Sequence, residues 1–332
     1  MYDVIVIGAG PAGLAAASVT QRHHLTTLVI APDLAGKAAY RLRLPWLQGP
    51  EVIVGEDTVE HLRLQLVTAQ RATRRVDIVE QVFRHNDIFH VITGEGGTFT
   101  ARAVIAASGV TPRTLGVLGE QRLLGYGLTY SATSHIHLFA GRRVVVVGGD
   151  LRALRAVAEL RVIAEHVTLI APDQVGLGGY ALGQRLLHDQ RVTVLVQATV
   201  VEIIGETHVT GIVVTTADGT TQAIPTDGVF IEHGLLAHTG FLGALVERTP
   251  TGHIVVDDRC ATHCAGLFAA GDVTSSTYAE QILIALGEGT RAGLSACAYV
   301  FEDGTGESPP GVASNPDLER QLGRAVADRS VE

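Results

Sequence analysis

Short apolar runs separated by small or polar residues recur along the chain and predict buried strands. The first run, residues 4–7, is rich in β-branched residues and leads directly into a glycine-rich turn. Further strand-like runs lie at 26–30, 104–107, 143–147, 167–170, 254–256 and 267–270. Helix-like stretches lie at 11–17, 56–73, 151–164 and 280–300. This alternation of strands and helices predicts an α/β protein with parallel sheets.

Two stretches depart from that alternation. Residues 75–104 read as short alternating strands, with turns at 85–87 and 94–97. Residues 302–332 open with Gly, Ser and Pro, as a linker does, and close with a predicted short helix that Asn315 could cap. We expect this end of the chain to be a docked tail or a dimer contact rather than a catalytic element.

The glycines after the first run have the spacing G-x-G-x-x-G, at Gly8, Gly10 and Gly13. In such a turn the first glycine makes the turn, the second lets the backbone approach a pyrophosphate, and the third lets helix and strand pack closely. The phosphates would then lie at the positive end of the helix. A glycine turn can also be purely structural, but the strand and helix around it favour dinucleotide binding. Asp33 lies at about the distance at which an acidic residue binds the ribose hydroxyls.

The second half of the chain repeats this pattern. A strand-like run at 143–147 precedes Gly148, and the motif VIAPD at 29–33 returns as LIAPD at 169–173. The two aspartates stand 25 positions after their opening glycines, Asp33 after Gly8 and Asp173 after Gly148. We infer two related nucleotide-binding halves in one chain.

Composition narrows the class of protein. A chain of 332 residues with 46% hydrophobic content is long enough for two domains with cores of their own. A formal net charge of -9 argues against nucleic acid or an anionic membrane surface as the main partner. No apolar run is long enough to span a bilayer, and the first residues read as a core strand, so we expect a soluble, cytoplasmic protein. The three cysteines fit a reducing compartment and form no disulfide framework.

Several segments together resemble the low-molecular-weight thioredoxin reductases of the pyridine nucleotide-disulfide oxidoreductase family. They are VIGAGPAGLAAA at 6–17, AASG at 106–109, GLFAAGDV at 266–273 and EQILIALGEG at 280–289. The resemblance implies two Rossmann-like, three-layer ββα domains and a homodimer. It assigns 1–113 and 245–332, the latter with the tail 303–332, to a discontinuous FAD-binding domain. It assigns 114–244 to an inserted NAD(P)-binding-like domain.

The resemblance also implies which residues hold FAD. Gly8, Gly10 and Gly13 would hold the pyrophosphate, Asp272 the ribityl chain, and Gln281 with Ile282 the isoalloxazine ring. Lys37 would bring a positive charge near the flavin or its phosphates, or would be a solvated surface lysine. The other residues assigned to the site are Pro11, Ala12, Asp33, Gly36, Ser108, Gly109 and Gly271.

The segment that carries the redox dithiol in thioredoxin reductases is altered. Ser131 and Ser134 stand where the family has its two cysteines, and His135 replaces an acidic proton donor. Two serines form no disulfide, and a serine hydroxyl is hardly ionised near neutral pH, so we expect no thioredoxin reduction by the family mechanism. His135 could act as acid or base beside the flavin, or pair with His137 at a metal, but no spaced Cys/His set supports a metal site.

The remaining cysteines do not restore the dithiol. Cys260 and Cys264, if extended, would stand about 13 Å apart at about 3.3 Å per residue, whereas a disulfide needs Cα atoms within about 7 Å. We read them as buried or edge cysteines, with a redox pair as the alternative.

The nucleotide-binding motif of the predicted insert is altered too. Asp150 replaces the glycine that touches pyrophosphate, and a carboxylate there adds bulk and like charge beside a phosphate. Ala171, Pro172 and Asp173 replace the basic cluster that binds the 2′-phosphate of NADPH. We expect NADPH to bind poorly. Arg152 or Arg155 could offset Asp150 for NADH, or the insert could be a scaffold only, which we favour.

These departures predict a flavin that exchanges electrons directly with a small molecule or with an electron-transfer protein such as ferredoxin. The resemblance also allows a second flavin. The alternatives are a non-catalytic FAD-binding scaffold or redox sensor, and an NADH-dependent flavin reductase.

Overall fold

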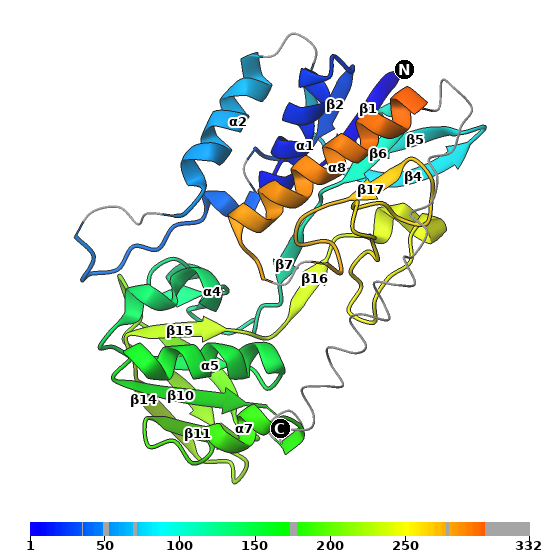
Figure 1. Cartoon of the computed structure of the whole chain (residues 1–332). Coiled ribbons are helices and arrows are strands. Elements are labelled where there is room, and N and C mark those ends of the chain that lie inside the picture. Colours follow the sequence, from blue (N-terminus) through cyan, green and yellow to red (C-terminus); the bar gives the residue numbers. More distant parts are fainter. Residues whose placement is uncertain (35, 49–52, 69–71, 173–177, 277–278, 303–332) are drawn as a thin grey trace, which may run out of the picture.

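The chain folds into two α/β halves that meet at a narrow connection (Figure 1). The structure is a computed structural model, and it describes residues 1–34, 36–48, 53–68, 72–172, 178–276 and 279–302. The predicted short helix near the C-terminus and Asp173 therefore lie outside the described residues.

The first half is built on one sheet in the order β3-β2-β1-β6-β5-β4, with β17 paired to β6. Strands β1, β2, β3, β6 and β17 run parallel, whereas β4, β5 and β6 pair antiparallel. The strands are β1 (Tyr2–Ile7), β2 (Thr27–Ile30), β3 (Ala72–Arg75), β4 (Val79–His85), β5 (Ile88–Thr93), β6 (Thr98–Ala106) and β17 (Leu267–Ala269). The helices are α1 (Pro11–Arg22), α2 (Glu56–Thr68) and α8 (Ile282–Glu302), with short turns η1 (Gly36–Ala39) and η3 (Gly240–Leu245).

Alternation along β1 explains the layers of this half. Val4 and Val6 face one way and belong to the core beneath α1 and α8, whereas Ile5 and Ile7 face the core beneath the β4–β5 hairpin and η3. The sheet is therefore buried on both faces, which is why its strands read as continuous apolar runs.

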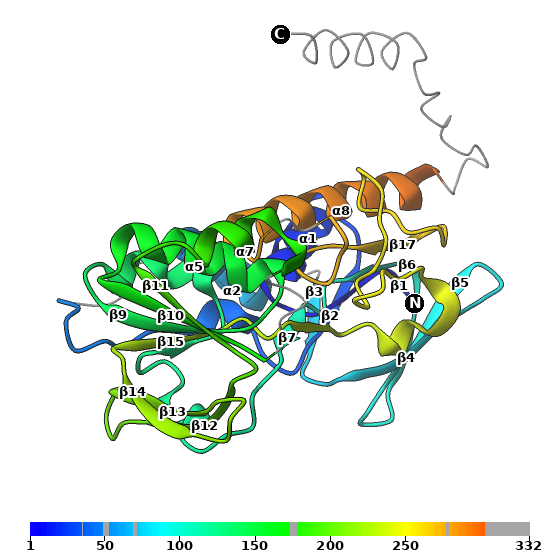
Figure 2. The ribbon, with the colours of Figure 1, turned by 90° about the horizontal axis from the view of Figure 1, so that it is seen from below.

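The second half repeats this architecture. Its parallel sheet has the order β11-β10-β9-β15-β8, with helices on one face and an antiparallel meander on the other (Figure 2). The strands are β8 (Leu128–Thr129), β9 (Arg143–Val147), β10 (His166–Ala171), β11 (Val192–Val196) and β15 (Gly228–Ile231), and the meander is β12 (Thr199–Ile204), β13 (Gly211–Thr215) and β14 (Thr221–Pro225). The helical elements are α3 (Glu120–Leu123), α4 (Ala132–His135), η2 (Ile136–Phe139), α5 (Leu151–Ile163) and α7 (Ala181–Leu186).

Two short strands carry the chain between the halves. β7 (Val110–Pro112) leaves the first half, and β16 (Leu235–Ala237) returns to it, paired antiparallel to β7. Figure 1 shows this pair between the two sheets.

The three-layer α/β fold with two related halves is confirmed, and three local predictions were wrong. The helix predicted at 56–73 cannot reach its predicted end, because Ala72–Arg75 form β3. The run at 104–107 is not a strand of its own but the end of the long strand β6. The run at 254–256 makes only isolated bridges, through Ile254 to Arg248 and Thr274.

Candidate functional site

The glycine turn after β1 lies at the carboxyl edge of the parallel strands, the usual place for ligands in such sheets. Gly8 has φ +105°, and a Cβ there would lie 2.2 Å from the Ala107 carbonyl oxygen. A Cβ on Gly13 would lie 2.0 Å from the Gly8 carbonyl oxygen, whereas a Cβ on Gly10 would meet nothing within 4 Å. The outer glycines are required by packing, and the middle glycine faces open space.

The N-terminus of α1 is suited to an anion. The helix begins at Pro11, and Gly10, its N-cap, offers no side chain to bond the first N–H groups. The first turn of the helix holds no acidic residue. The first N–H groups of a helix have no partner within the helix and attract negative charge. Together with the open space at Gly10, these features fit the pyrophosphate of a dinucleotide.

The predicted neighbours of this turn are brought to it. Asp33 is exposed, and its Oδ1 accepts the Gly36 N–H at 3.0 Å. Gly36 in turn lies against Gly10, because a Cβ on Gly36 would be 3.4 Å from the Gly10 Cα. On the far side of the turn, Gly271 has φ +79°, and a Cβ there would lie 2.9 Å from the Cβ of Ala12.

Ser108 and Gly109 lie where β6 passes into β7. The Ser108 hydroxyl donates to the His238 carbonyl oxygen at 2.6 Å, and the His238 N–H donates to the Gly109 carbonyl at 3.2 Å. These two residues thus hold the connection between the halves against the carboxyl edge of the first sheet.

Five charged side chains from both halves meet beside Asp272 and form what we call the charged cluster. Lys37 Nζ lies 2.8 Å from Asp272 Oδ2 and also pairs with Glu280. Arg152, at the start of α5, pairs with Glu280 and with Glu232, which follows β15. The cluster therefore alternates in sign from Asp272 to Glu232 and crosses from one half to the other.

Within the charged cluster, burial and ion pairing shift the pKa of each side chain in opposite directions. Burial would raise the pKa of Glu280, but Lys37 and Arg152 outweigh it and hold this pKa below its usual value. Burial raises the pKa of Asp272 and of Glu232, and the ion pairs with Lys37 and with Arg152, which lower it, do not outweigh this effect. Burial would likewise lower the pKa of Lys37, but attraction to Glu280 and Asp272 raises it overall.

The serine segment is brought next to the start of α8. The Ser131 hydroxyl donates to Ser134 Oγ at 3.0 Å, and the Gln281 side-chain amide donates to the Thr133 carbonyl oxygen at 3.2 Å. Glu232 accepts the Ala132 N–H at 2.8 Å, which fixes the first residue of α4. The serine segment thus contacts Gln281 through the Thr133 carbonyl, and Ile282 begins α8 against the core of the first half.

His135 is buried, with 5% of its surface exposed. Its Nδ1 lies 2.7 Å from the Thr129 hydroxyl and 3.0 Å from the Ser131 carbonyl oxygen. The structure does not pair it with His137, which is exposed. Among the residues that the structure describes, no group of three or more His, Cys, Asp or Glu side chains is arranged to hold a metal ion.

Asp150 closes the second glycine turn. It is the N-cap of α5, and its Oδ1 accepts the Ala153 N–H at 3.0 Å. A carboxylate at a helix N-cap satisfies one of the free N–H groups that a phosphate would otherwise bind. At the start of α5 the Ala153 N–H is already bonded in this way.

All three cysteines are free. Burial raises the pKa of Cys260 and of Cys297 to about 11, so both stay protonated near neutral pH. Cys264 is only partly buried.

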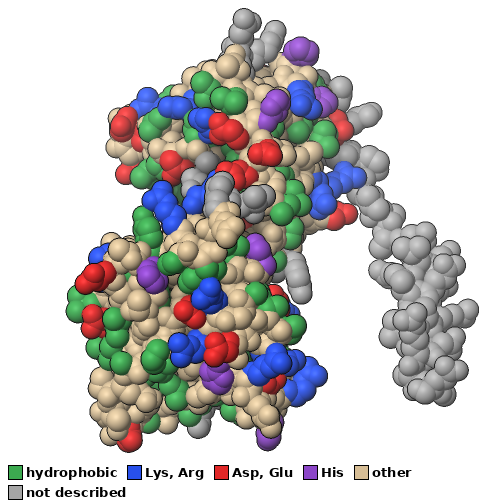
Figure 3. Space-filling view, turned by 90° about the vertical axis from the view of Figure 1, so that its left-hand side faces the viewer, with side chains coloured by type: hydrophobic (Ala, Val, Ile, Leu, Met, Phe, Trp, Pro, Cys, Tyr) green, Lys and Arg blue, Asp and Glu red, His purple; other side chains and the backbone are tan. Residues whose placement is uncertain are grey.

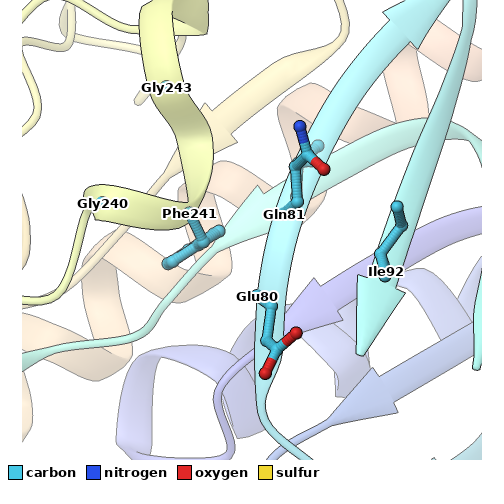
Figure 4. Close-up of a pocket in the computed structure, with 7 residues that line it drawn as sticks. Glu80, Gln81, Ile92, Gly240, Phe241 and Gly243 are labelled. Carbon is cyan, nitrogen blue, oxygen red and sulfur yellow. The ribbon is translucent and has the colours of Figure 1, made fainter. Parts of the chain in front are cut away.

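A surface groove lies elsewhere, between β4 and η3 (Figure 4). Its volume is about 410 Å³, and it is lined by Glu80, Gln81, Val82, Ile92, Gly240, Phe241 and Gly243. It holds no residue of the glycine turn or of the charged cluster. A smaller cavity of about 70 Å³ borders the cluster, lined in part by Arg152, His253 and Asp272. Figure 3 shows basic and acidic side chains interspersed over one face of the molecule, without a large region of a single sign.

The charged cluster includes a residue that sequence reasoning missed. Glu232 is 2% exposed and links Arg152 to the serine segment. A signal was present, because Glu232 directly follows the apolar run of β15, at the same edge of the sheet as Gly148.

Residues 2–289 match the family described as pyridine nucleotide-disulphide oxidoreductase, and the chain belongs to this family. It is accordingly a flavin-dependent oxidoreductase of thioredoxin reductase-like fold.

Individual relatives agree with this assignment. Thioredoxin reductase from Listeria monocytogenes is 35% identical over 305 residues, which cover 91% of this chain and 95% of the relative. A component of alkyl hydroperoxide reductase from Pseudomonas aeruginosa is 34% identical over 309 residues, 90% of this chain, but the chain spans only 58% of that protein. The crystal structure of thioredoxin reductase from Streptococcus pyogenes matches with a TM-score of 0.80 and 27% identity over 91% of this chain and 99% of that one. Within the described residues, no helix has the length and apolar character that crossing a membrane requires.

Proposed function

We propose that this protein binds FAD across the glycine turn of its first half and exchanges electrons at the flavin without a dithiol and without NADPH. The observation that carries the proposal is the segment in which Ser131 bonds to Ser134 and whose Thr133 carbonyl accepts from Gln281, at the positions where the family resemblance would put the dithiol. The electron partner is then a small molecule or an electron-transfer protein such as ferredoxin.

The chain's own residues fit FAD in three places. The helix start at Gly10 and Pro11 would bind the pyrophosphate, since its N–H groups are uncapped and a Cβ on Gly10 would meet only open space. Asp272 would accept a hydrogen bond from the ribityl chain, and Gln281 with Ile282 would line the ring. FAD, when bound, supplies a ring that accepts and returns electrons.

The second half would then act as a support for the serine segment. Asp150 already caps α5, which argues against a pyrophosphate there. Arg152 pairs with Glu280 and Glu232 instead of offsetting Asp150. Proton transfer by His135 would have to use Nε2, because Nδ1 is engaged by Thr129 and by Ser131.

We further propose that 1–113 and 245–332 form the FAD-binding domain, that 114–244 form the insert, and that the protein is a homodimer. Homodimerisation is the expectation from the family resemblance, and the molecular mass in solution tests it.

Anaerobic titration of the purified flavoprotein tests the proposal. We expect dithionite to bleach the flavin and equimolar NADPH or NADH to leave it oxidised for minutes. Reduction by reduced ferredoxin would identify a protein partner. Rapid bleaching by either nicotinamide nucleotide would contradict the proposal, and protein that takes up no FAD would remove its basis. A flavin that is reduced but passes electrons to no acceptor would favour the sensor alternative.

A further inference from the structure

Glu288 lies on α8, and its buried side-chain carboxylate accepts hydrogen bonds from residues outside that helix. It is 7% exposed, and its Oε2 accepts the Gly271 N–H at 2.7 Å. Thr274 donates its hydroxyl to the same oxygen at 3.3 Å, and Ser276 donates to Oε1 at 3.3 Å. A carboxylate is acceptor-only when ionised, and here it receives donors from one short loop.

That loop carries Asp272. It follows β17 and makes a tight turn, in which Thr274 N–H donates to the Gly271 carbonyl at 2.9 Å. Three of its residues, Gly271, Thr274 and Ser276, donate to Glu288. Asp272 itself pairs with Lys37 at 2.8 Å. The carboxylate of Glu288 therefore holds the loop through the residues on either side of Asp272.

The same place joins the loop to the glycine turn. A Cβ on Gly289 would lie 2.0 Å from the Ala12 carbonyl oxygen, so α8 touches the first turn of α1 directly beside Glu288. Gly271 stands against Ala12 as well. Glu288 thus holds the loop next to a close contact between α1 and α8.

We infer that Glu288 is a positioning residue for FAD binding, which acts through the 271–276 loop to place Asp272 against the flavin ribityl chain. This inference rests on the proposed function. It predicts that Glu288 and Asp272 contribute to FAD affinity as one unit, because the carboxylate of Asp272 helps only when the loop holds it in place.

A double-mutant cycle measures this coupling in the full-length apoprotein, with FAD affinity followed by quenching of flavin fluorescence. We expect Glu288→Ala to weaken FAD binding at least tenfold in the wild-type background and less than threefold in the Asp272→Asn background. Glu288→Gln keeps one acceptor for the Gly271 N–H and should lose only about threefold, which guards against a Glu288→Ala protein that does not fold. Ser295→Ala removes a different α8 hydrogen bond, from Ser295 to the Arg259 carbonyl, and should leave affinity unchanged.

Two results separate the possible failures. If the wild-type protein binds FAD but the effects of Glu288→Ala and Asp272→Asn multiply, Glu288 has a general structural role and the inference is wrong. The same conclusion follows if Ser295→Ala weakens FAD binding by the same factor as Glu288→Gln. If the wild-type protein binds no FAD, the proposed function itself fails.

Discussion

Asp77 shows how closely a single buried carboxylate can be tied to the fold. It follows β3 and accepts hydrogen bonds from the Ile78 N–H at 2.8 Å and from Arg75 Nε at 2.9 Å. Bonding from the Thr93 hydroxyl, followed by Arg75 and backbone N–H groups, lowers its pKa to about 2. The folded protein therefore prefers the ionised form more strongly than the unfolded chain does.

We predict that the stabilisation of the folded protein by Asp77 is lost at acid pH. Because the pKa of Asp77 is lower in the folded state, its contribution is complete above about pH 5 and is lost as pH falls toward about 2. Urea unfolding of wild type and Asp77→Asn measures it: the stability difference should be constant above about pH 5 and shrink below about pH 4. Glu247→Gln, at an exposed carboxylate outside this network, should leave the wild-type pH profile unchanged. A stability difference that does not vary with pH would contradict the assignment.

Among single residues, the sequence predicted those whose role depends on nearby parts of the chain. Gly8 and Gly13 were predictable because their reasons are steric and lie within a few residues or one strand away. The partner of Lys37 was not predictable, because Asp272 and Glu280 are more than 200 positions away and only the fold brings them together. For the same reason the sequence left open that Arg152 or Arg155 offsets Asp150, whereas the Arg152 guanidinium reaches Glu280 and Glu232.

Among the elements, α8 gives the sharpest contrast between neighbouring positions. Gly287 and Gly289 lie on one helix, yet a Cβ would meet nothing within 4 Å at Gly287 and would lie 2.0 Å from the Ala12 carbonyl at Gly289. One glycine is required by the contact between α8 and α1, and the other is not.

We therefore predict opposite effects for the same substitution at these two sites. Gly289→Ala should lower the free energy of unfolding by about 3 kcal/mol, because backbone must move apart. Gly287→Ala should raise it by up to about 1 kcal/mol, since alanine favours the helix. Urea unfolding of both variants beside the wild type is sufficient. Equal losses at the two sites would show that α8 does not pack on α1 as described.

Element prediction succeeded where hydrophobic pattern and turn signals agreed. The β1–α1–β2 unit and its repeat β9–α5–β10 combine β-branched runs, a glycine turn and a helix within about 30 residues. Prediction failed where tertiary pairing decided the outcome. The end of the helix predicted at 56–73 lies in β3, whose residues join the sheet edge beside β2.

In the whole molecule, the charged cluster is an ionic contact between the halves, and Leu235 of the connecting strand β16 lines the same small cavity as Arg152, Asp272 and Glu280. Arg152 belongs to the second half and Glu280 to the start of α8 in the first. Removing one partner of a mostly buried pair leaves the other charge uncompensated.

We predict that Arg152→Gln loosens the contact between the halves. The Ala132 amide, which donates to Glu232, should exchange its hydrogen at least tenfold faster, and the free energy of unfolding should fall by about 2 kcal/mol. Hydrogen exchange with mass spectrometry over residues 128–139 measures the first effect. Arg161→Gln is the matched control, since Arg161 pairs with Asp189 within the second half and is more exposed. Unchanged exchange in Arg152→Gln would show that Arg152 does not hold Glu232 in place against the Ala132 amide.

The antiparallel pairing of β7 with β16 determines how far apart the chain leaves the first half and returns to it. Pro112 and Leu235 are register partners, so the chain departs and comes back at points about 5 Å apart. A two-residue β-hairpin spans such a gap. Residues 113–234 could thus be deleted and Pro112 joined to Leu235 through a short turn without stretching the remaining backbone.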